Sequence, residues 1–161
     1  SPDKGTLLFV GGTGLGKTGW AGCIAREGAG RGYSVVYDTA ISRFSTFEAK
    51  KCSRDLGQER QARDDTRRYL NCDLLILDDL GSVLTTPLAQ SLLSEVVNSR
   101  LHGGKHTIIP TNLSMAQTSA RSTPHVVSRL AGAYQALTFY GLDTRLMRSK
   151  ATIFFFCTIC T

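Results

Sequence analysis

A glycine-rich segment near the start of the chain constrains the fold more than any other feature. Residues 11–18 read GGTGLGKT, which fits the pattern G-x-x-x-x-G-K-[S/T]. The segment follows an apolar run at 6–10, which predicts a buried strand, and leads into 17–31, which predicts a helix. Glycines let such a loop turn its backbone N–H groups towards phosphate oxygens, and the helix N-terminus adds its positive dipole end. A strand, this loop and a helix together predict a phosphate-binding site.

Lys17 and Thr18 end this loop with a positive charge and a hydroxyl group. Lys17 would reach the β- and γ-phosphates of a nucleoside triphosphate, and the Thr18 hydroxyl would bind Mg²⁺. We therefore predict ATP and Mg²⁺ as cofactors. The residues predicted to bind the nucleotide are Gly11, Gly12, Thr13, Gly14, Leu15, Gly16, Lys17 and Thr18.

The same stretch also fits a weaker pattern. Gly14, Gly16 and Gly19 match G-x-G-x-x-G, and Asp38 follows at about the distance seen in dinucleotide-binding proteins. This alternative leaves Lys17 and the later carboxylates unexplained. We therefore favour the triphosphate site.

A second apolar run ends in two carboxylates. Residues 73–79 read DLLILDD, which predicts a buried strand that ends at Asp78 and Asp79. Asp78 would hold Mg²⁺ through its water shell, and Asp79 would polarise the attacking water. The pair resembles the second half of an NTPase site, in which Glu more often stands at the position of Asp79. The shorter side chain of Asp predicts slow hydrolysis or the need for an added water. An ordinary strand followed by a turn is the alternative, which the upstream loop makes the weaker interpretation.

Asn112 follows another predicted strand, at 106–109. In this position it resembles the polar residue that senses the γ-phosphate in additional-strand ATPases, and its amide suits that task because it can both donate to a phosphate and accept from water. A turn-forming asparagine is the alternative use of this residue type.

The remaining apolar runs alternate with longer amphipathic segments. Further strands are predicted at 34–37 and 135–140, and helices at 87–101 and 124–131, with two more within 44–70. The runs lack a regular polar–apolar alternation, which predicts an α/β fold with a parallel sheet and helices on both faces. Trp20 and Ile24, four residues apart, are expected to pack on this sheet. A length of 161 residues fits one domain, since domains run roughly 100–200 residues.

Composition narrows the class of protein. A 42% hydrophobic content argues against disorder, and no apolar run approaches the ~18 residues of a membrane-spanning helix. The five cysteines are odd in number and scattered, which predicts reduced thiols and a cytoplasmic location. Cys157 and Cys160 form a lone C-x-x-C, which lacks the four ligands of a structural zinc site.

The net charge of +6 suits a polyanionic partner such as nucleic acid. Arginines gather in the polar middle of the chain, at Arg54, Arg60, Arg63, Arg67 and Arg68. Acidic residues at 55, 59, 64 and 65 lie between them. This mixture favours a solvated helix with i,i+4 ion pairs over a track for single-stranded DNA.

Five motifs follow one another in a recognisable order. They are LFVGGTGLGKT at 8–18, DLLILDDLG at 73–81, TNL at 111–113, SRL at 128–130 and FYGLDTR at 139–145. In this order the chain resembles bacterial helicase loaders of the DnaC/DnaI type, over about residues 5–148. These loaders are AAA+ ATPases related to the IstB-type transposition helpers.

The resemblance implies a P-loop NTPase fold of the AAA+ type, a three-layer sandwich with strand order 5-1-4-3-2. It also implies ATP hydrolysis, ATP-dependent self-association, and a replicative helicase and single-stranded DNA as partners. By motif matching, Arg129 would be an arginine finger that reaches the γ-phosphate held by a neighbouring subunit. Arg145 would be a second sensor for the nucleotide of its own subunit. The alternative for each is a solvated surface arginine.

Two features depart from the loaders. Only residues 1–5 precede the first strand, where loaders carry a helicase-binding region, and the end ATIFFFCTICT is unlike theirs. We expect an AAA+ core at 1–150 without a separate lid domain, and an apolar tail at 151–161 as a candidate edge strand. Two alternatives to a loader stay open: an IstB-type transposition helper, and a nucleotide-dependent binding module that does not hydrolyse ATP.

Overall fold

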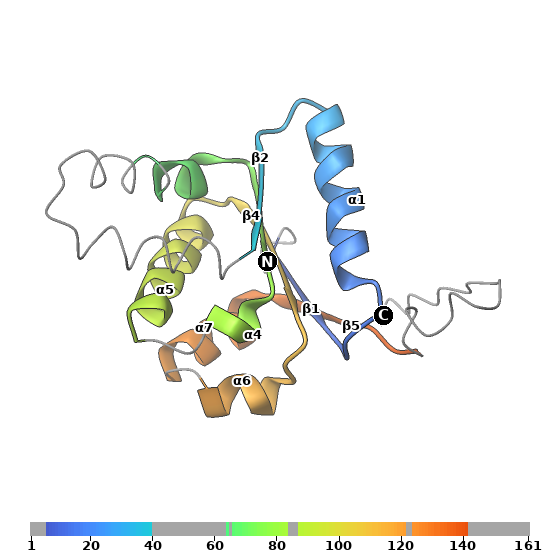
Figure 1. Cartoon of the computed structure of the whole chain (residues 1–161). Coiled ribbons are helices and arrows are strands. Elements are labelled where there is room, and N and C mark those ends of the chain that lie inside the picture. The colour runs from blue at the N-terminus through green and yellow to red at the C-terminus, as the bar shows by residue number, and fades with distance from the viewer. Residues whose placement is uncertain (1–5, 40–63, 65, 84–86, 122–123, 142–161) are drawn as a thin grey trace, which may run out of the picture.

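The computed structural model describes residues 6–39, 64, 66–83, 87–121 and 124–141. They form a parallel sheet with α1 on one face and the other labelled helices on the opposite side (Figure 1). The predicted α/β fold with helices on both faces is thereby confirmed.

The sheet has five strands in the order β2-β3-β4-β1-β5, and every described strand pair is parallel. The strands are β1 (Thr6–Val10), β2 (Val35–Thr39), β3 (Leu74–Asp78), β4 (His106–Thr111) and β5 (Gln135–Thr138). This is the predicted order 5-1-4-3-2, read from the other edge. Because all strands run the same way, the glycine loop after β1, the carboxylates at the end of β3 and the polar end of β4 meet at one edge of the sheet.

The described helices are α1 (Lys17–Gly30), α4 (Leu80–Val83), α5 (Pro87–His102), α6 (Met115–Arg121) and α7 (Pro124–Ala133). Residues 66–71 are also helical, whereas most of the predicted segment 44–70 lies outside the described residues. The short helices α4 and α6 were not predicted. None of the described helices is long and apolar enough to cross a bilayer.

Two hydrophobic clusters form the core, one on each face of the sheet. The cluster under α1 contains Phe9, Ala21, Leu74, Ile76 and Ile108. The larger cluster, under α5 and α7, includes Leu75, Leu77, Leu93, Val97 and Leu130. Successive residues of β3 thus enter opposite clusters, and all of β3 is buried, which is why its sequence shows no polar alternation.

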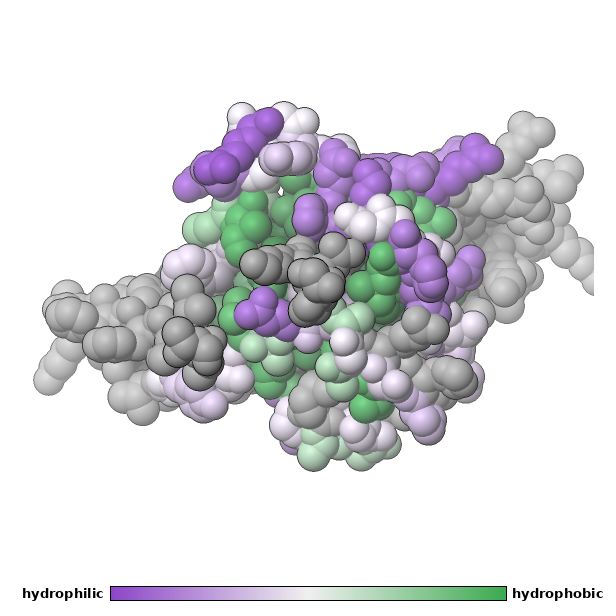
Figure 2. Space-filling view, turned by 180° about the vertical axis from the view of Figure 1, so that it is seen from behind, coloured by the Kyte–Doolittle hydropathy of each residue, from purple (hydrophilic) through white to green (hydrophobic). Residues whose placement is uncertain are grey.

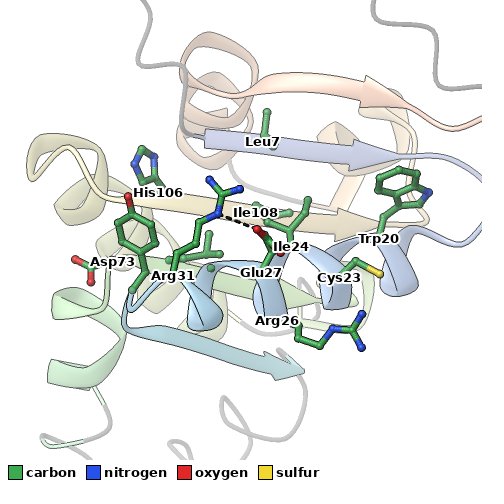
Figure 3. A pocket seen from close by; sticks show the side chains of 13 residues that line it. Leu7, Trp20, Cys23, Ile24, Arg26, Glu27, Arg31, Asp73, His106 and Ile108 are labelled. Carbon is green, nitrogen blue, oxygen red and sulfur yellow. Dashed lines mark hydrogen bonds and ion pairs between the residues drawn. The ribbon is translucent and has the colours of Figure 1, made fainter.

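One packing expectation was wrong. Ile24 packs against the cluster under α1, but Trp20 is 43% exposed. Trp20 belongs to the first turn of α1, next to the glycine loop, where the helix only begins to cover the sheet. Figure 3 shows the Trp20 ring near the N-terminal end of α1, beyond Ile24.

Arg100 of α5 lies at the edge of the sheet opposite the glycine loop, and it is only 1% exposed. Its guanidinium donates hydrogen bonds to the carbonyl oxygens of Tyr69, Cys72 and His106 and to Oγ1 of Thr107. This side chain thereby connects α5 to the segments that enter β3 and β4. Sequence reasoning did not identify it.

The molecular surface is mixed in character. On the face in Figure 2, hydrophobic residues are visible in the middle of the molecule and hydrophilic residues gather along the upper edge. The arginines at 54, 60 and 63, singled out in the sequence, lie outside the described residues, while Arg67 and Arg68 are exposed. The sequence-based assignment of this arginine segment to a solvated helix therefore stays a prediction.

Candidate functional site

A cavity of about 290 Å³ lies at the carboxyl ends of the strands. Nine of the residues predicted for the site line it: Thr13, Gly14, Leu15, Gly16, Lys17, Thr18, Asp78, Asp79 and Asn112. Thr39 and Pro110 line it as well and were not predicted. The fold therefore brings the loop, the acidic strand end and the polar strand end together around one space.

The loop needs its glycines for two different reasons. Gly14 and Gly16 have φ angles of 78° and 81°, in the left-handed region that glycine adopts without a steric penalty. At Gly11, a Cβ atom would lie 2.6 Å from the backbone oxygen of Phe139. The start of the loop can therefore pass close to the end of β5 only because Gly11 has no side chain.

Lys17 is buried and turns back onto its own loop. Its Nζ donates hydrogen bonds to the carbonyl oxygens of Gly11, at 2.7 Å, and Gly12, at 2.5 Å. Burial lowers the pKa of the Lys17 ammonium, and the negative charge of Asp78 partly opposes this. Gly11 and Gly12 thus contribute to the site through these carbonyls, although they are absent from the described lining of the cavity.

Asp78 ends β3 with a buried carboxylate, 8% exposed. Its Oδ2 accepts a hydrogen bond of 2.7 Å from the Tyr37 hydroxyl, and its Oδ1 accepts one of 2.9 Å from the Asp79 N–H. Burial raises the pKa of the Tyr37 hydroxyl above its usual value, and the hydrogen bond and charge of Asp78 raise it further. Tyr37 therefore remains a donor to Asp78 at physiological pH.

Asp79 has a φ angle of 58°, a left-handed conformation that is uncommon outside glycine. The chain turns here from β3 into α4. Asp and Asn tolerate this region better than residues with longer side chains. The backbone thus offers a physical reason for the short side chain of Asp at this position.

The oxygen atoms at this cavity fit a magnesium ion. Thr18, Asp78 and Asp79 line one space, and hydroxyl and carboxylate oxygens are hard ligands of the kind that Mg²⁺ prefers. Thr39 adds a further hydroxyl-bearing residue, because it lies opposite Asp78 in the register of β2 and β3. The only sequence signal for Thr39 is its position just after a predicted strand, which the fold places beside the strand that ends in Asp78.

The structure does not test the two predicted arginines. Arg129 belongs to α7, but its side chain lies outside the described residues, as does all of Arg145. Their predicted roles stay predictions.

The carboxylate of Asp38 accepts a hydrogen bond from the Tyr69 hydroxyl at 2.8 Å and is absent from the described cavity lining. This position gives no support to the dinucleotide interpretation.

A larger cavity, of about 730 Å³, lies between α1 and the sheet (Figure 3). Apolar residues such as Leu7, Ile24 and Ile108 line it together with charged ones, among them Glu27 and Arg31, which form an ion pair of 2.8 Å. Among the described residues, none of those predicted for nucleotide chemistry lines it. The chemistry of the site therefore belongs to the smaller cavity.

Comparisons with known proteins agree with this geometry. The family model described as IstB-like ATP binding protein matches residues 2–128. An ATP-binding protein of the insertion sequence IS1162 from Pseudomonas fluorescens is 31% identical over 127 residues. That match covers 75% of this chain and 49% of the relative, so the chain spans about half of the relative's length.

Solved structures show the same fold. The DnaC helicase loader superposes with a TM-score of 0.71 at 25% identity, covering 87% of this chain and 81% of that one. AMPPCP-bound DnaA from Aquifex aeolicus gives a TM-score of 0.74 at 19% identity, covering 89% of this chain and 42% of that one. The fold is thus that of the P-loop AAA+ proteins. By its sequence, its fold and the residues around its cavity, the chain belongs to the family of IstB-like ATP-binding proteins.

Proposed function

We propose that this chain binds Mg·ATP in the cavity at the carboxyl ends of its strands and hydrolyses it. The observation that carries this proposal is the convergence of Lys17, Thr18, Asp78, Asp79 and Asn112 on one space. These residues come from three separate segments of the chain. A glycine loop alone would not explain why Asp78, Asp79 and Asn112 line the same cavity.

Each residue has a task in the proposed reaction. The N–H groups of the loop and the Lys17 ammonium would bind the phosphates. Thr18 and Asp78 would hold Mg²⁺, which would supply positive charge to neutralise the transferring phosphoryl group. Asp79 orients the attacking water and accepts its proton, and Asn112 donates to the γ-phosphate. The short side chain of Asp79 predicts a slow reaction. Arg129 of a second copy would add positive charge at the γ-phosphate, and Arg145 would sense the nucleotide of its own copy.

Phosphate release by the wild type and by Asp79→Asn tests hydrolysis. Asn tolerates the same left-handed backbone and keeps the shape of the side chain, so ATP affinity should not change. Loss of the base should lower the rate about 100-fold, within the range known for general bases. An unchanged rate would remove Asp79 from the mechanism. Wild-type protein that binds ATP at concentrations high enough to assemble, yet releases no phosphate, would identify a non-hydrolysing binding module.

For the biological role, we propose an ATP-dependent helper of transposition, acting with a transposase and target DNA. The family match over residues 2–128 and the insertion-sequence relative support this role. A transposase gene beside the gene for this chain would agree with it. Neighbouring replication genes would argue against it.

A helicase-loader role is the second candidate. The motifs at 128–130 and 139–145, and the DnaC helicase loader at 25% identity and a TM-score of 0.71, favour it. A replicative helicase and single-stranded DNA would then be the partners. Phosphate release should rise with single-stranded DNA for a loader and with duplex target DNA for a transposition helper. This comparison separates the two roles.

A further inference from the structure

Tyr37 contacts the proposed metal-binding carboxylate although it does not itself belong to the described lining of the cavity. It lies on β2, an edge strand of the described sheet, opposite Ile76 of β3. Asp78 follows Ile76 by two residues, so its side chain lies on the same face of β3. Tyr37 and Asp78 are therefore diagonal neighbours, a spacing that a tyrosine ring can bridge. The hydroxyl reaches Oδ2 of Asp78 at 2.7 Å.

Both oxygens of the Asp78 carboxylate are held by protein donors. The Asp79 N–H is bound to Oδ1 at 2.9 Å, and the Tyr37 hydroxyl is bound to Oδ2 at 2.7 Å. The first bond is made by the backbone of the next residue. The second comes from another strand and prevents the carboxylate from rotating about its last bond. The remaining lone pairs of Asp78 therefore have set directions before any ligand arrives.

We propose that Tyr37 is a positioning residue for Mg²⁺, which orients the Asp78 carboxylate for the metal and its water shell. This inference rests on the proposed function, because it assigns Asp78 to the metal. Partners of metal-binding groups commonly change metal affinity by 10–100-fold when they are removed. Tyr37 is 38% exposed, and Tyr37→Phe keeps the ring and removes only the hydroxyl.

A second tyrosine provides a matched control. The hydroxyl of Tyr69 donates to Oδ2 of Asp38 at 2.8 Å, nearly the same distance as the bond between Tyr37 and Asp78. Tyr69 is buried, and neither it nor Asp38 is among the described residues that line the cavity. Tyr69→Phe thus removes a bond of the same chemistry, from a neighbouring carboxylate with no proposed role in metal binding.

The test is the Mg²⁺ dependence of nucleotide binding, measured with a fluorescent ATP analogue from EDTA to saturating Mg²⁺. For Tyr37→Phe we expect the half-saturating Mg²⁺ concentration to rise about tenfold, with the metal-free affinity unchanged. Tyr69→Phe should leave both values at the wild-type level. In an Asp78→Asn background, Tyr37→Phe should have no further effect, because the hydroxyl acts through the carboxylate.

The outcomes separate the inference from the proposed function. Wild-type protein that binds no nucleotide would overturn both. Wild-type protein that binds Mg·ATP, with the same Mg²⁺ midpoint in Tyr37→Phe, would overturn the inference alone. A rise of the same size in the Mg²⁺ midpoint of Tyr69→Phe would show a general structural effect and overturn the inference. Nucleotide binding by Tyr37→Phe that is weakened equally with and without metal would overturn it for the same reason.

Discussion

At the scale of single residues, three charged side chains are buried in the described part of the chain: Lys17, Asp78 and Arg100. Removing a charge from water costs several kcal/mol, which good partners must offset. Lys17 and Asp78 face the cavity, where phosphate and metal would complete their partners. Arg100 has its partners already, since it donates to carbonyl oxygens at the opposite edge of the sheet.

Replacing Arg100 should therefore lower stability without touching the cavity. Arg100→Met leaves the buried carbonyls of Tyr69, Cys72 and His106 without this donor, and each unpaired group costs about 1–3 kcal/mol. We expect the free energy of unfolding, measured in urea, to fall by about 3 kcal/mol or more. Arg26→Met, at an exposed position of α1, is the control and should change it by less than about 0.5 kcal/mol. Equal effects would contradict the role given to Arg100.

Asp73 gives a prediction about pH. Hydrogen bonds from the hydroxyl and N–H of Ser34, and then the ion pair with Lys105, hold the pKa of Asp73 well below its usual 3.8. A lowered carboxyl pKa means that the charged form stabilises the fold above pH 3.8, and that this stabilisation is lost as the pH falls below it. Asp73→Asn should therefore melt at a lower temperature than wild type near neutral pH. The difference in melting temperature between the two proteins should become smaller below pH 3.8. A difference that does not depend on pH would contradict this account.

Tyr37, Arg100 and Thr39 could not have been predicted from spacing along the chain. Tyr37 and Asp78 are 41 residues apart, and Arg100 and Cys72 are 28 apart. Strand pairing brings Tyr37 to Asp78, and the packing of α5 near the start of β3 brings Arg100 to Cys72. Lys17 and Thr18 were predictable because loop, strand and helix are consecutive in the sequence. Asp79 was predicted to polarise the attacking water, and that role stays a prediction. Its left-handed backbone was not predicted, because the residue at this position is not a glycine.

At the scale of elements, all five strands were predicted because buried apolar runs are continuous in this type of sheet. The boundaries differ by a residue or two: the helix predicted at 17–31 ends at Gly30, and the strand predicted at 135–140 ends at Thr138. Helices α4 and α6 have four and seven residues, which is too short for a helical period to show. Trp20 was misplaced because periodicity says nothing about where a helix starts to cover the sheet.

The glycines of α1 make the next prediction. A Cβ atom at Gly22 would meet nothing within 4 Å, whereas one at Gly28 would lie 3.4 Å from Cγ2 of Val35. Gly22→Ala should raise the free energy of unfolding by about 0.5–1 kcal/mol, through helix propensity and a less flexible unfolded chain. Gly28→Ala should gain at least as much, because its new methyl group would make ordinary van der Waals contacts with Val35 and Leu74. Urea unfolding of both variants measures the two changes, and a loss of stability in Gly28→Ala would contradict the described packing.

At the scale of the whole molecule, the strand order was predicted through a resemblance and is confirmed by the structure. The parallel strands place three distant motifs around one cavity, so much of the site follows from the fold. The division into a core at 1–150 and a tail at 151–161, the lack of a lid and the role of Arg145 depend on residues 142–161, outside the described range. They stay predictions.

Self-association follows from the role proposed for Arg129. Light scattering should show a larger mass with ATP than with ADP or without nucleotide, because the γ-phosphate is the group that the neighbour's arginine would contact. Arg129→Ala should abolish this increase and keep ATP binding. Arg121→Ala, at the exposed end of α6, should behave like wild type. A mass that does not depend on nucleotide would contradict an arginine acting between copies.

The central claim is that the cavity around Lys17 binds ATP, and calorimetric titration with Mg·ATP tests it most directly. Wild-type protein should bind one ATP, and Lys17→Ala should bind at least about tenfold more weakly, since it loses a charge-assisted hydrogen bond worth roughly 1.5–3 kcal/mol. Lys105→Ala, which removes a lysine paired with Asp73 at the other edge of the sheet, should bind as wild type does. Wild-type protein that binds no ATP, or Lys17→Ala protein that binds it equally well while folded, would contradict the account.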